Sequence, residues 1–358
     1  MKAAVCRAFG KPLVVEEINI ESPRKDEIKV RLAATAICHS DIHILTGEGG
    51  GKTPMVAGHE SAGYIEEVGE GVSYVKIGDP VVLSLLSNCG TCRYCIGGLP
   101  HLCETQMPLR RETRLSDSKA NPIVQAFSTG SFAEYSTVHQ SQVVKIPQDM
   151  PMDRAALLGC GVITGFGAVV NTARVKPLDS VAVIGTGGVG LNAIQGAAFS
   201  GAYPIIAVDT MPGKLEAANK FGATHTVDAG KGDPVEAVKR LTQGRGVEYA
   251  FITVGSARAM EQGLTMTARR GTAVIVGLTR ESVSVSPFSF VNGERRLIGS
   301  AMGSTNLRLD VPRLVDLYKA GKLKLDELVT AHYPLEEINL AIDKVLKGQA
   351  LRNVIMFE

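Results

Sequence analysis

The chain has 358 residues, of which 45% are hydrophobic and 21% are charged, and its formal net charge at pH 7 is +2. This length favours two domains over one core, and a near-neutral charge without basic blocks gives no indication of a nucleic acid or an anionic membrane surface as partner. No run of 18 apolar residues and no signal-peptide core is present. We therefore expect a cytoplasmic protein with neither kind of partner.

Residues 1 to about 160 are predicted to be rich in β-structure, because strand-like runs at 13–18, 27–32 and 132–138 are separated by frequent glycines. Residues 105–130 are polar, and we interpret them as a long surface lobe. The three glycines at 49–51 predict a flexible loop.

From about 162 to 302 the pattern changes to an alternation of strands and helices, which predicts a parallel sheet with right-handed crossovers. The predicted strands are 181–184, 205–208, 249–254 and 272–276, and the predicted helices are 189–200, 213–221, 234–242 and 258–268. After this part we expect helices near 310–320 and 335–347 and a terminal strand at 353–357.

One stretch of the second part carries a signature for a dinucleotide. Residues 181–191 comprise a β-branched run, then Gly185, Gly187 and Gly190 in G-x-G-x-x-G spacing, then the apolar start of a helix. Such glycines allow a tight turn, a close approach of the backbone to a pyrophosphate, and close packing of the helix. Asp209 ends the next strand, 19 residues after Gly190, where an acid would bind a ribose 2′-hydroxyl. We interpret the stretch as a nicotinamide-dinucleotide site, with an empty turn of the same shape as the alternative.

The seven cysteines would not form disulfides in a reducing compartment, so their spacing points to a metal or to catalysis. Cys89, Cys92, Cys95 and Cys103 follow a C-x2-C-x2-C-x7-C pattern. Four thiolates within 15 residues suit one tetrahedral zinc ion with no open position, and hence a structural site. An iron–sulfur cluster with similar spacing is the alternative.

Three further candidates, Cys38, His59 and Cys160, are far apart in the sequence. Each has an ordinary interpretation by itself, as a buried cysteine or a loop histidine. Together, two cysteines and a histidine would match a catalytic zinc, which has three protein ligands and one open position. Cys6 has no such neighbours, and we predict that it only packs in the core.

These motifs together resemble those of the zinc-dependent medium-chain dehydrogenases, the liver-type and class III alcohol dehydrogenase family, over essentially the full length. The resemblance is carried by Cys38-His-Ser-Asp, Gly58-His-Glu, the four-cysteine segment, Gly159-Cys-Gly and Gly185-x-Gly-x-x-Gly. It implies an α/β fold of two domains with the active site in the cleft between them. A GroES-like β-barrel catalytic domain would comprise 1–161 and 303–358, with a structural zinc lobe at about 86–106. A Rossmann coenzyme domain with a doubly wound parallel sheet would comprise 162–302.

The resemblance also implies a site, residue by residue. Two zinc ions per chain would be held by Cys38, His59 and Cys160 (catalytic) and by Cys89, Cys92, Cys95 and Cys103 (structural). Ser40 would hydrogen-bond the substrate oxygen, His43 would end a proton relay at the surface, and Glu60 would approach the metal from behind. Asp41 would orient His59. The implied contacts to NAD are His39, Thr164, Gly185, Gly187, Gly188, Val189, Gly190, Asp209, Lys214, Val276 and Arg352.

Within that set, His39 and Arg352 are expected near the pyrophosphate, and Thr164 and Val276 near the nicotinamide. Asp209 and Lys214 would contact the adenosine ribose. The carboxylate of Asp209 favours NAD over NADP because it would repel a 2′-phosphate.

The implied mechanism is that of an alcohol dehydrogenase. Zinc would lower the pKa of the alcohol, whose proton would leave through Ser40, the nicotinamide ribose hydroxyl and His43. Hydride would pass to the nicotinamide.

We expect reversible oxidation of a primary alcohol, medium-chain or aryl, to the aldehyde. Leu85 stands where liver-type relatives often place an aromatic pocket wall, and several segments resemble bacterial enzymes that act on such alcohols. The first alternative is S-(hydroxymethyl)glutathione (formaldehyde) dehydrogenase, for which Arg110, Arg111 and Arg114 could anchor the glutathione carboxylates. Further alternatives are a zinc-free quinone or enoyl reductase and a non-catalytic binding protein. The resemblance also favours a homodimer joined through the Rossmann sheet edge near 294–300, with a tetramer as the alternative.

Overall fold

The computed structural model describes residues 1–358 and divides into two compact units. We call Met1–Cys160 with Asn306–Glu358 the split unit, and Gly161–Thr305 the central unit. The expected domain boundaries differ from these by one residue at the first junction and three at the second.

The split unit contains two sheets, in the strand orders β2-β1-β5-β9-β8-β3 and β11-β7-β6-β4-β19-β18, and β10 also pairs with β4. Its strands are β1 Lys2–Cys6, β2 Val14–Glu17, β3 Asn19–Ile20, β4 Glu27–Ala36, β5 Met55–Val56, β6 Glu60–Val68, β7 Pro80–Leu83, β8 Leu115–Ser116, β9 Pro122–Gln125, β10 Tyr135–His139, β11 Val143–Lys145, β18 Val329–Tyr333 and β19 Arg352–Met356. Its helices are α1 His39–Leu45, α2 Arg93–Ile96, α3 Met152–Leu157, α10 Leu307–Lys319 and α11 Ile338–Leu346, with short η1 Pro100–Leu102, η2 Pro108–Arg110, η3 Ala126–Ser128, η4 Gln140–Gln142, η7 Asp326–Leu328 and η8 Leu335–Glu337.

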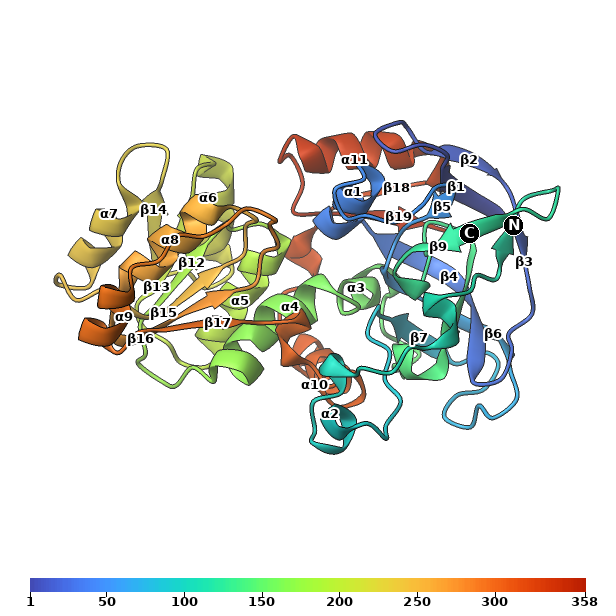
Figure 1. Cartoon of the computed structure of the whole chain (residues 1–358), viewed down its shortest axis with the longest axis horizontal. Coiled ribbons are helices and arrows are strands. Elements are labelled where there is room, and N and C mark those ends of the chain that lie inside the picture. The colour runs from blue at the N-terminus through green and yellow to red at the C-terminus, as the bar shows by residue number, and fades with distance from the viewer. The chain divides into compact units, whose positions relative to one another are not determined.

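The end of the chain completes the second sheet of the split unit. Strand β19 pairs antiparallel with β4, with Val354 opposite Ala36, and parallel with β18. Helix α11 lies beside β19 (Figure 1) and buries Ile338, Ala341 and Val345 in the same core as the first strand. The expected barrel completed by the C-terminal tail is therefore confirmed.

The central unit alternates strands and helices along the chain, as the sequence predicts (Figure 1). Its strands are β12 Val181–Ile184, β13 Ile205–Asp209, β14 His225–Asp228, β15 Val247–Ile252, β16 Thr267–Ile275 and β17 Arg296–Gly299. Its helices are α4 Gly161–Gly167, α5 Gly188–Phe199, α6 Pro212–Lys220, α7 Pro234–Leu241, α8 Ala257–Met266 and α9 Pro287–Gly293, with η5 Ala168–Ala173 and η6 Met302–Ser304.

All six strands of the central unit are parallel, in the order β14-β13-β12-β15-β16-β17. The first strand of the unit, β12, therefore lies in the middle of the sheet, between β13 on one side and β15 on the other. Alternate residues of β12, Ala182 and Ile184, face a core that also contains Val238 of α7 and Leu264 of α8. This order is that of a doubly wound Rossmann sheet, so the predicted fold class is confirmed.

The structure departs from the predicted elements in a few places. Residues 105–130 are not only a surface lobe, because they contain β8 and β9 and bury Arg114. Helix α9 lies where no helix was expected, although Pro287 at its first turn is a helix-start signal. The helix predicted at 335–347 is divided into η8 and α11. None of the helices has the length and apolar character needed to cross a membrane.

Candidate functional site

Three elements of the split unit bring Cys38, His59 and Cys160 together. Cys38 caps the N-terminus of α1 directly after β4, His59 immediately precedes β6, and Cys160 follows α3. Their ligand atoms all lie within 4.8 Å of one another, and the three residues are buried. We call this set the Cys38 cluster. Two sulfurs and one imidazole nitrogen are the donor set of a zinc site with one open position, so the residues fit the expected metal.

Asp41 holds two of these ligand segments in place. Its carboxylate accepts hydrogen bonds from the backbone N–H of Cys38 (3.1 Å) and of Gly58 (3.0 Å). It also lies 2.8 Å from Nδ1 of His59. A carboxylate can only accept at this distance, so Nδ1 carries the hydrogen and Nε2 is left to bind a metal. Nε2 indeed points at the cluster, 3.2 Å from Sγ of Cys160.

Close packing behind His59 explains a glycine in the same motif. Gly58 has φ +95°, and a Cβ there would lie 2.6 Å from the ring of Phe132. Only glycine suits this left-handed backbone and this space. The glycine of the Gly-His-Glu motif therefore allows the backbone conformation that places the side chain of His59 in the site.

The electrostatics of the Cys38 cluster suit a cation. The hydrogen bond with Cys160 holds the pKa of the Cys38 thiol well below its ordinary value, and His59 acts in the same direction. Burial lowers the pKa of His59, but the charge and hydrogen bond of Asp41 more than compensate and raise it well above the ordinary value. The cluster thus stabilises a thiolate beside a protonated imidazole, and a divalent cation would take the place of that proton.

A strained turn lies against the cluster. The ring of Phe127 packs 4.6 Å from the imidazole of His59, centroid to centroid. Phe127 and Ser128 both have φ +56°, a left-handed conformation that costs non-glycine residues free energy. Hydrogen bonds from Ser128 Oγ to Leu109 O (3.0 Å) and from Thr129 Oγ1 to Gly58 O (2.7 Å) hold the turn. No pattern in the sequence marks Phe127 as a neighbour of the site.

The four remaining cysteines of the metal motifs form a second cluster around α2. Cys89, Cys92, Cys95 and Cys103 place their sulfurs within 4.8 Å of one another. Backbone N–H groups of Cys92 and Thr91 donate to Sγ of Cys89 at 3.2 and 3.4 Å, which favours a thiolate. None of the seven cysteines forms a disulfide. Four sulfurs at this spacing fit a closed tetrahedral zinc site.

In the central unit the glycine loop joins β12 to α5. Gly185 has φ +89°, and a Cβ on Gly190 would lie 1.9 Å from the carbonyl oxygen of Gly185. Gly187 is the N-cap of α5 and has open space where a Cβ would stand. Gly188 and Val189 form the first turn of the helix. The loop therefore leaves room at the helix N-terminus, where backbone N–H groups favour an anion.

Asp209 stands at the end of β13, beside this loop. Its carboxylate accepts hydrogen bonds from the N–H (2.8 Å) and Oγ1 (3.1 Å) of Thr186 and from the N–H of Met211 (3.0 Å). A carboxylate offers about four acceptor positions, so at least one remains for a ligand hydroxyl.

Family models of known proteins match segments of both units. Residues 24–148 match the family model of the alcohol dehydrogenase GroES-like domain, and residues 188–320 match that of the zinc-binding dehydrogenases. The NDMA-dependent alcohol dehydrogenase of Amycolatopsis methanolica is 39% identical over 370 residues, which cover 99% of this chain and 98% of the relative. The chain belongs to the zinc-dependent medium-chain alcohol dehydrogenase family.

Solved structures of this family extend the match to the whole fold. An alcohol dehydrogenase zinc-binding domain protein from Burkholderia ambifaria is similar with a TM-score of 0.95 and 34% identity, covering 100% of this chain and 98% of the other. Benzyl alcohol dehydrogenase from Acinetobacter calcoaceticus is similar with a TM-score of 0.93 and 34% identity, covering 100% and 99%. The chain is thus an oxidoreductase of the alcohol dehydrogenase type.

Two charged residues lie beside the Cys38 cluster of this dehydrogenase. Glu60 is fully buried and neither of its carboxylate oxygens has a hydrogen-bond partner. Nε of Arg352, at the start of β19, lies 3.5 Å from it. Burial raises the pKa of Glu60 to about 7 even though Arg352 opposes the shift. The resemblance named Glu60 and Arg352 separately but did not indicate their contact. Nη2 of Arg352 has no hydrogen-bond partner within the chain.

The other expected site residues lie on helices or strand ends. His39, Ser40 and His43 are on α1, and Ser40 and His43 share one face because they are three residues apart. Thr164 is on α4 with Oγ1 3.6 Å from Sδ of Met302, a neighbour that the sequence did not indicate. The remaining two are Lys214 in α6 and Val276, which directly follows β16.

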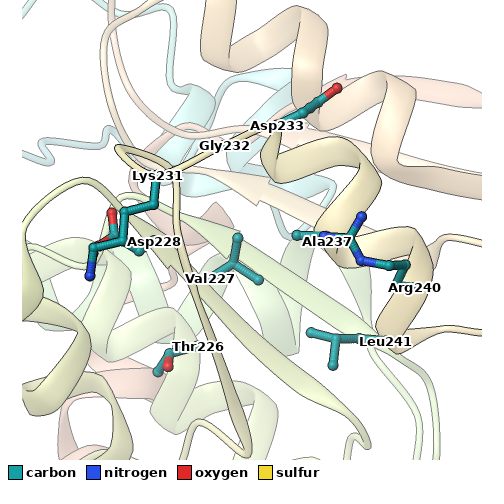
Figure 2. Close-up of a pocket in the computed structure, with 9 residues that line it drawn as sticks. All are labelled: Thr226, Val227, Asp228, Lys231, Gly232, Asp233, Ala237, Arg240 and Leu241. Atoms are coloured by element: carbon teal, nitrogen blue, oxygen red, sulfur yellow. The ribbon is translucent and has the colours of Figure 1, made fainter.

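The central unit also has a pocket that is separate from the glycine loop. Figure 2 shows its lining, which comes from β14, the following turn and α7 and includes Asp228, Lys231 and Arg240. Neither the glycine loop nor Asp209 lines it. We assign it no part in dinucleotide binding.

The arginines considered for glutathione differ in their surroundings. Arg114 is 2% exposed, and its Nε and Nη2 donate to both carboxylate oxygens of Glu27 at 2.9 and 2.6 Å. It therefore cannot serve as a surface anchor for a substrate carboxylate. Arg110 and Arg111 remain exposed.

Proposed function

We propose that this dehydrogenase oxidises primary alcohols, medium-chain or aryl, to aldehydes with NAD as hydride acceptor, and that the reaction is reversible. The observation that carries the proposal is the Cys38 cluster with its buried Asp41, a donor set with an open position for an alcohol oxygen. The NDMA-dependent and benzyl alcohol dehydrogenases to which the chain is similar support an alcohol as substrate.

The chain's own residues have separate tasks in this reaction. Cys38, His59 and Cys160 would hold zinc, which supplies Lewis-acid polarisation of the alcohol oxygen when bound. Ser40 would accept a hydrogen bond from the alcohol and start the removal of its proton, and His43 would release that proton to water at the surface of α1. A histidine suits the outer position because its ordinary pKa is near 6.5. Glu60 and Arg352 lie behind the ligands and adjust the charge of the cluster.

For the cofactor, we propose NAD rather than NADP, held by Gly185, Gly187, Gly188, Val189 and Gly190 and by Asp209 and Lys214. The carboxylate of Asp209 disfavours a 2′-phosphate, and the next residues, Thr210 to Gly213, contain no arginine to offset it. His39, Thr164, Val276 and Arg352 are proposed as the remaining contacts. NDMA in the name of a relative makes it a second acceptor to test.

We also propose a homodimer through the β17 edge of the central sheet. Strand β17 pairs only with β16, and next to it α9 exposes Phe288 (74%) and Val291 (81%). Such exposed apolar residues are typical of a protein interface. Light scattering of the purified chain tests this, and a monomer or a tetramer would contradict it.

A substrate panel tests the function itself. Initial rates would be measured with octanol, benzyl alcohol, a secondary alcohol and the glutathione–formaldehyde adduct, each with NAD, NADP and NDMA. The proposal expects the highest kcat/KM with a primary alcohol and NAD. Preference for the glutathione adduct would favour the formaldehyde dehydrogenase alternative instead, and zinc-independent reduction of a quinone or enoyl compound would favour a reductase.

A further inference from the structure

The proposed relay residue His43 has a partner that the relay does not include. Nδ1 of His43 lies 2.7 Å from Oε2 of Glu48. His43 is in the last turn of α1, and Glu48 is in the segment that follows the helix. Both side chains are at least half exposed, so the contact lies where a proton would reach solvent.

The backbone after α1 determines this contact. The N–H groups of Thr46, Gly47 and Gly49 donate to the carbonyl oxygens of Ile42, Ile44 and His43 at 2.9, 3.1 and 2.8 Å. These bonds fold the segment back over the last helical turn. A Cβ on Gly47 (φ +88°) would lie 3.2 Å from the ring of Phe9, so the segment also packs against the rest of the split unit. These hydrogen bonds and this packing hold Glu48 beside His43. Of the flexible loop predicted at 49–51, only Gly49 belongs to this segment.

The hydrogen bond between His43 and Glu48 selects one tautomer of the imidazole. An ionised carboxylate is only an acceptor, so Nδ1 of His43 must carry the hydrogen. In neutral histidine the other nitrogen, Nε2, then holds the lone pair that accepts a proton. Without Glu48, nothing in this contact would distinguish the two tautomers.

We propose that Glu48 is a positioning residue of the proton relay, which keeps His43 in the tautomer that accepts a proton at Nε2. The inference rests on the proposed alcohol oxidation. In the relay, neutral His43 gains one proton at Nε2 and becomes imidazolium. It then loses that proton to bulk water and returns to the Nδ1–H form, while Glu48 accepts the hydrogen bond from Nδ1 throughout.

The first test reads the tautomer directly and needs no turnover. Zinc-loaded protein with ¹⁵N-labelled histidine is examined by NMR at about pH 8, above the ordinary titration range of histidine. The His43 signals are assigned by their loss in His43→Ala. We expect the Nδ1–H form in the wild type, a mixture of tautomers in Glu48→Ala, and recovery in Glu48→Gln, whose amide oxygen still accepts. A wild-type spectrum of the Nε2–H form, or one unchanged in Glu48→Ala, would overturn the proposal.

The second test measures the role in turnover. Exposed ion pairs contribute little to folding, so the Glu48 variants should keep their structure. Glu48→Ala should lower kcat about three- to tenfold with little change in KM, less than the loss typical of a general acid or base itself. His43→Ala should lower kcat further, and adding Glu48→Ala to it should have no additional effect. Glu66→Gln, at another exposed glutamate of the same unit, is the matched control and should leave kcat unchanged.

The outcomes separate the two proposals. A wild-type chain that oxidises no alcohol would contradict the proposed function. An active wild type whose kcat is the same in Glu48→Ala, while His43→Ala is impaired, would overturn the role of Glu48 alone.

Discussion

The Oδ1 atom of Asp41 lies 2.8 Å from Nδ1 of His59, and both side chains are fully buried. The same carboxylate accepts the backbone N–H groups of Cys38 and Gly58. One side chain therefore joins two of the three ligand segments and fixes the tautomer of the histidine. The hydrogen bonds of Asp41 therefore contribute to the geometry of the Cys38 cluster.

The substitution Asp41→Asn should weaken zinc binding at the Cys38 cluster by about ten- to a hundredfold, as is typical for the loss of a carboxylate behind a ligand histidine. An asparagine has one acceptor oxygen and cannot serve His59 and both backbone groups. Zinc measured by elemental analysis after dialysis against a competing chelator should fall from about two to about one ion per chain. Asp343→Asn, at an exposed aspartate paired with Lys347, is the control and should keep two. Two retained zinc ions in Asp41→Asn would refute the role of Asp41.

The four-cysteine cluster should show unequal thiol reactivity once its metal is removed. Hydrogen bonding by Thr105 and Thr91 lowers the pKa of Cys89 to about 5, whereas burial raises the pKa of Cys95 to about 12. Because the thiolate is the reactive form, Cys89 is mostly reactive at about pH 6.5 and Cys95 is not. After chelation, iodoacetamide should label Cys89 first, as read by peptide mass spectrometry. Zinc-loaded protein should protect both, and faster labelling of Cys95 would contradict this account.

Cofactor preference should depend on Asp209. In Asp209→Ala the repulsion of a 2′-phosphate is removed, so the ratio of kcat/KM for NAD to that for NADP should fall about tenfold or more, equivalent to at least about 1.4 kcal/mol. Asp228 lies opposite Asp209 in the β13–β14 register, and its carboxylate accepts a hydrogen bond from the N–H of Gly230 in the turn after β14, so Asp228→Ala is a matched control. An unchanged ratio in Asp209→Ala would show that another feature selects the cofactor.

The buried pair of Arg114 and Glu27 should matter for stability rather than for substrate binding. In Arg114→Met the carboxylate of Glu27 stays buried without a charged partner and keeps only the hydrogen bond from the backbone N–H of Arg24 (3.0 Å). Removing one member of a buried ion pair typically costs about 3–5 kcal/mol. Thermal unfolding should show a large decrease in Tm that adding Glu27→Met partly reverses. Arg24→Met removes only exposed ion pairs and should change stability by less than about 0.5 kcal/mol. If the single Arg114 variant keeps its Tm and instead loses activity with the glutathione adduct, this interpretation is wrong.

The sequence predicted those elements well whose signal lies in adjacent residues. The β-branched run at 181–184 and the glycines after it predicted β12 and the start of α5 to within a residue, because tight turns and helix packing restrict such positions to glycine. Family resemblance then connected Cys38, His59 and Cys160, which spacing alone could not do.

The rest depends on contacts between distant segments. Arg114 and Glu27 are 87 residues apart, and the polar character of the intervening chain made the arginine look exposed. Arg352 and Glu60 meet only because β19 joins β4, next to β6. Glu48 is five residues from His43, which is no helical spacing, and it reaches the imidazole only through the turn after α1. The periodicity of a sequence reports local secondary structure and does not predict such tertiary contacts.

Direct transfer of hydrogen from the alcohol carbon to the cofactor tests the central claim most directly. Benzyl alcohol with two deuteriums on the carbinol carbon would be oxidised by the zinc-loaded chain with NAD, and the reduced cofactor analysed by mass spectrometry. The account predicts one deuterium per molecule of reduced cofactor, and no product with Cys160→Ser, a variant expected to lack the metal of the Cys38 cluster. Reduced cofactor without deuterium, or full activity of Cys160→Ser, would contradict it.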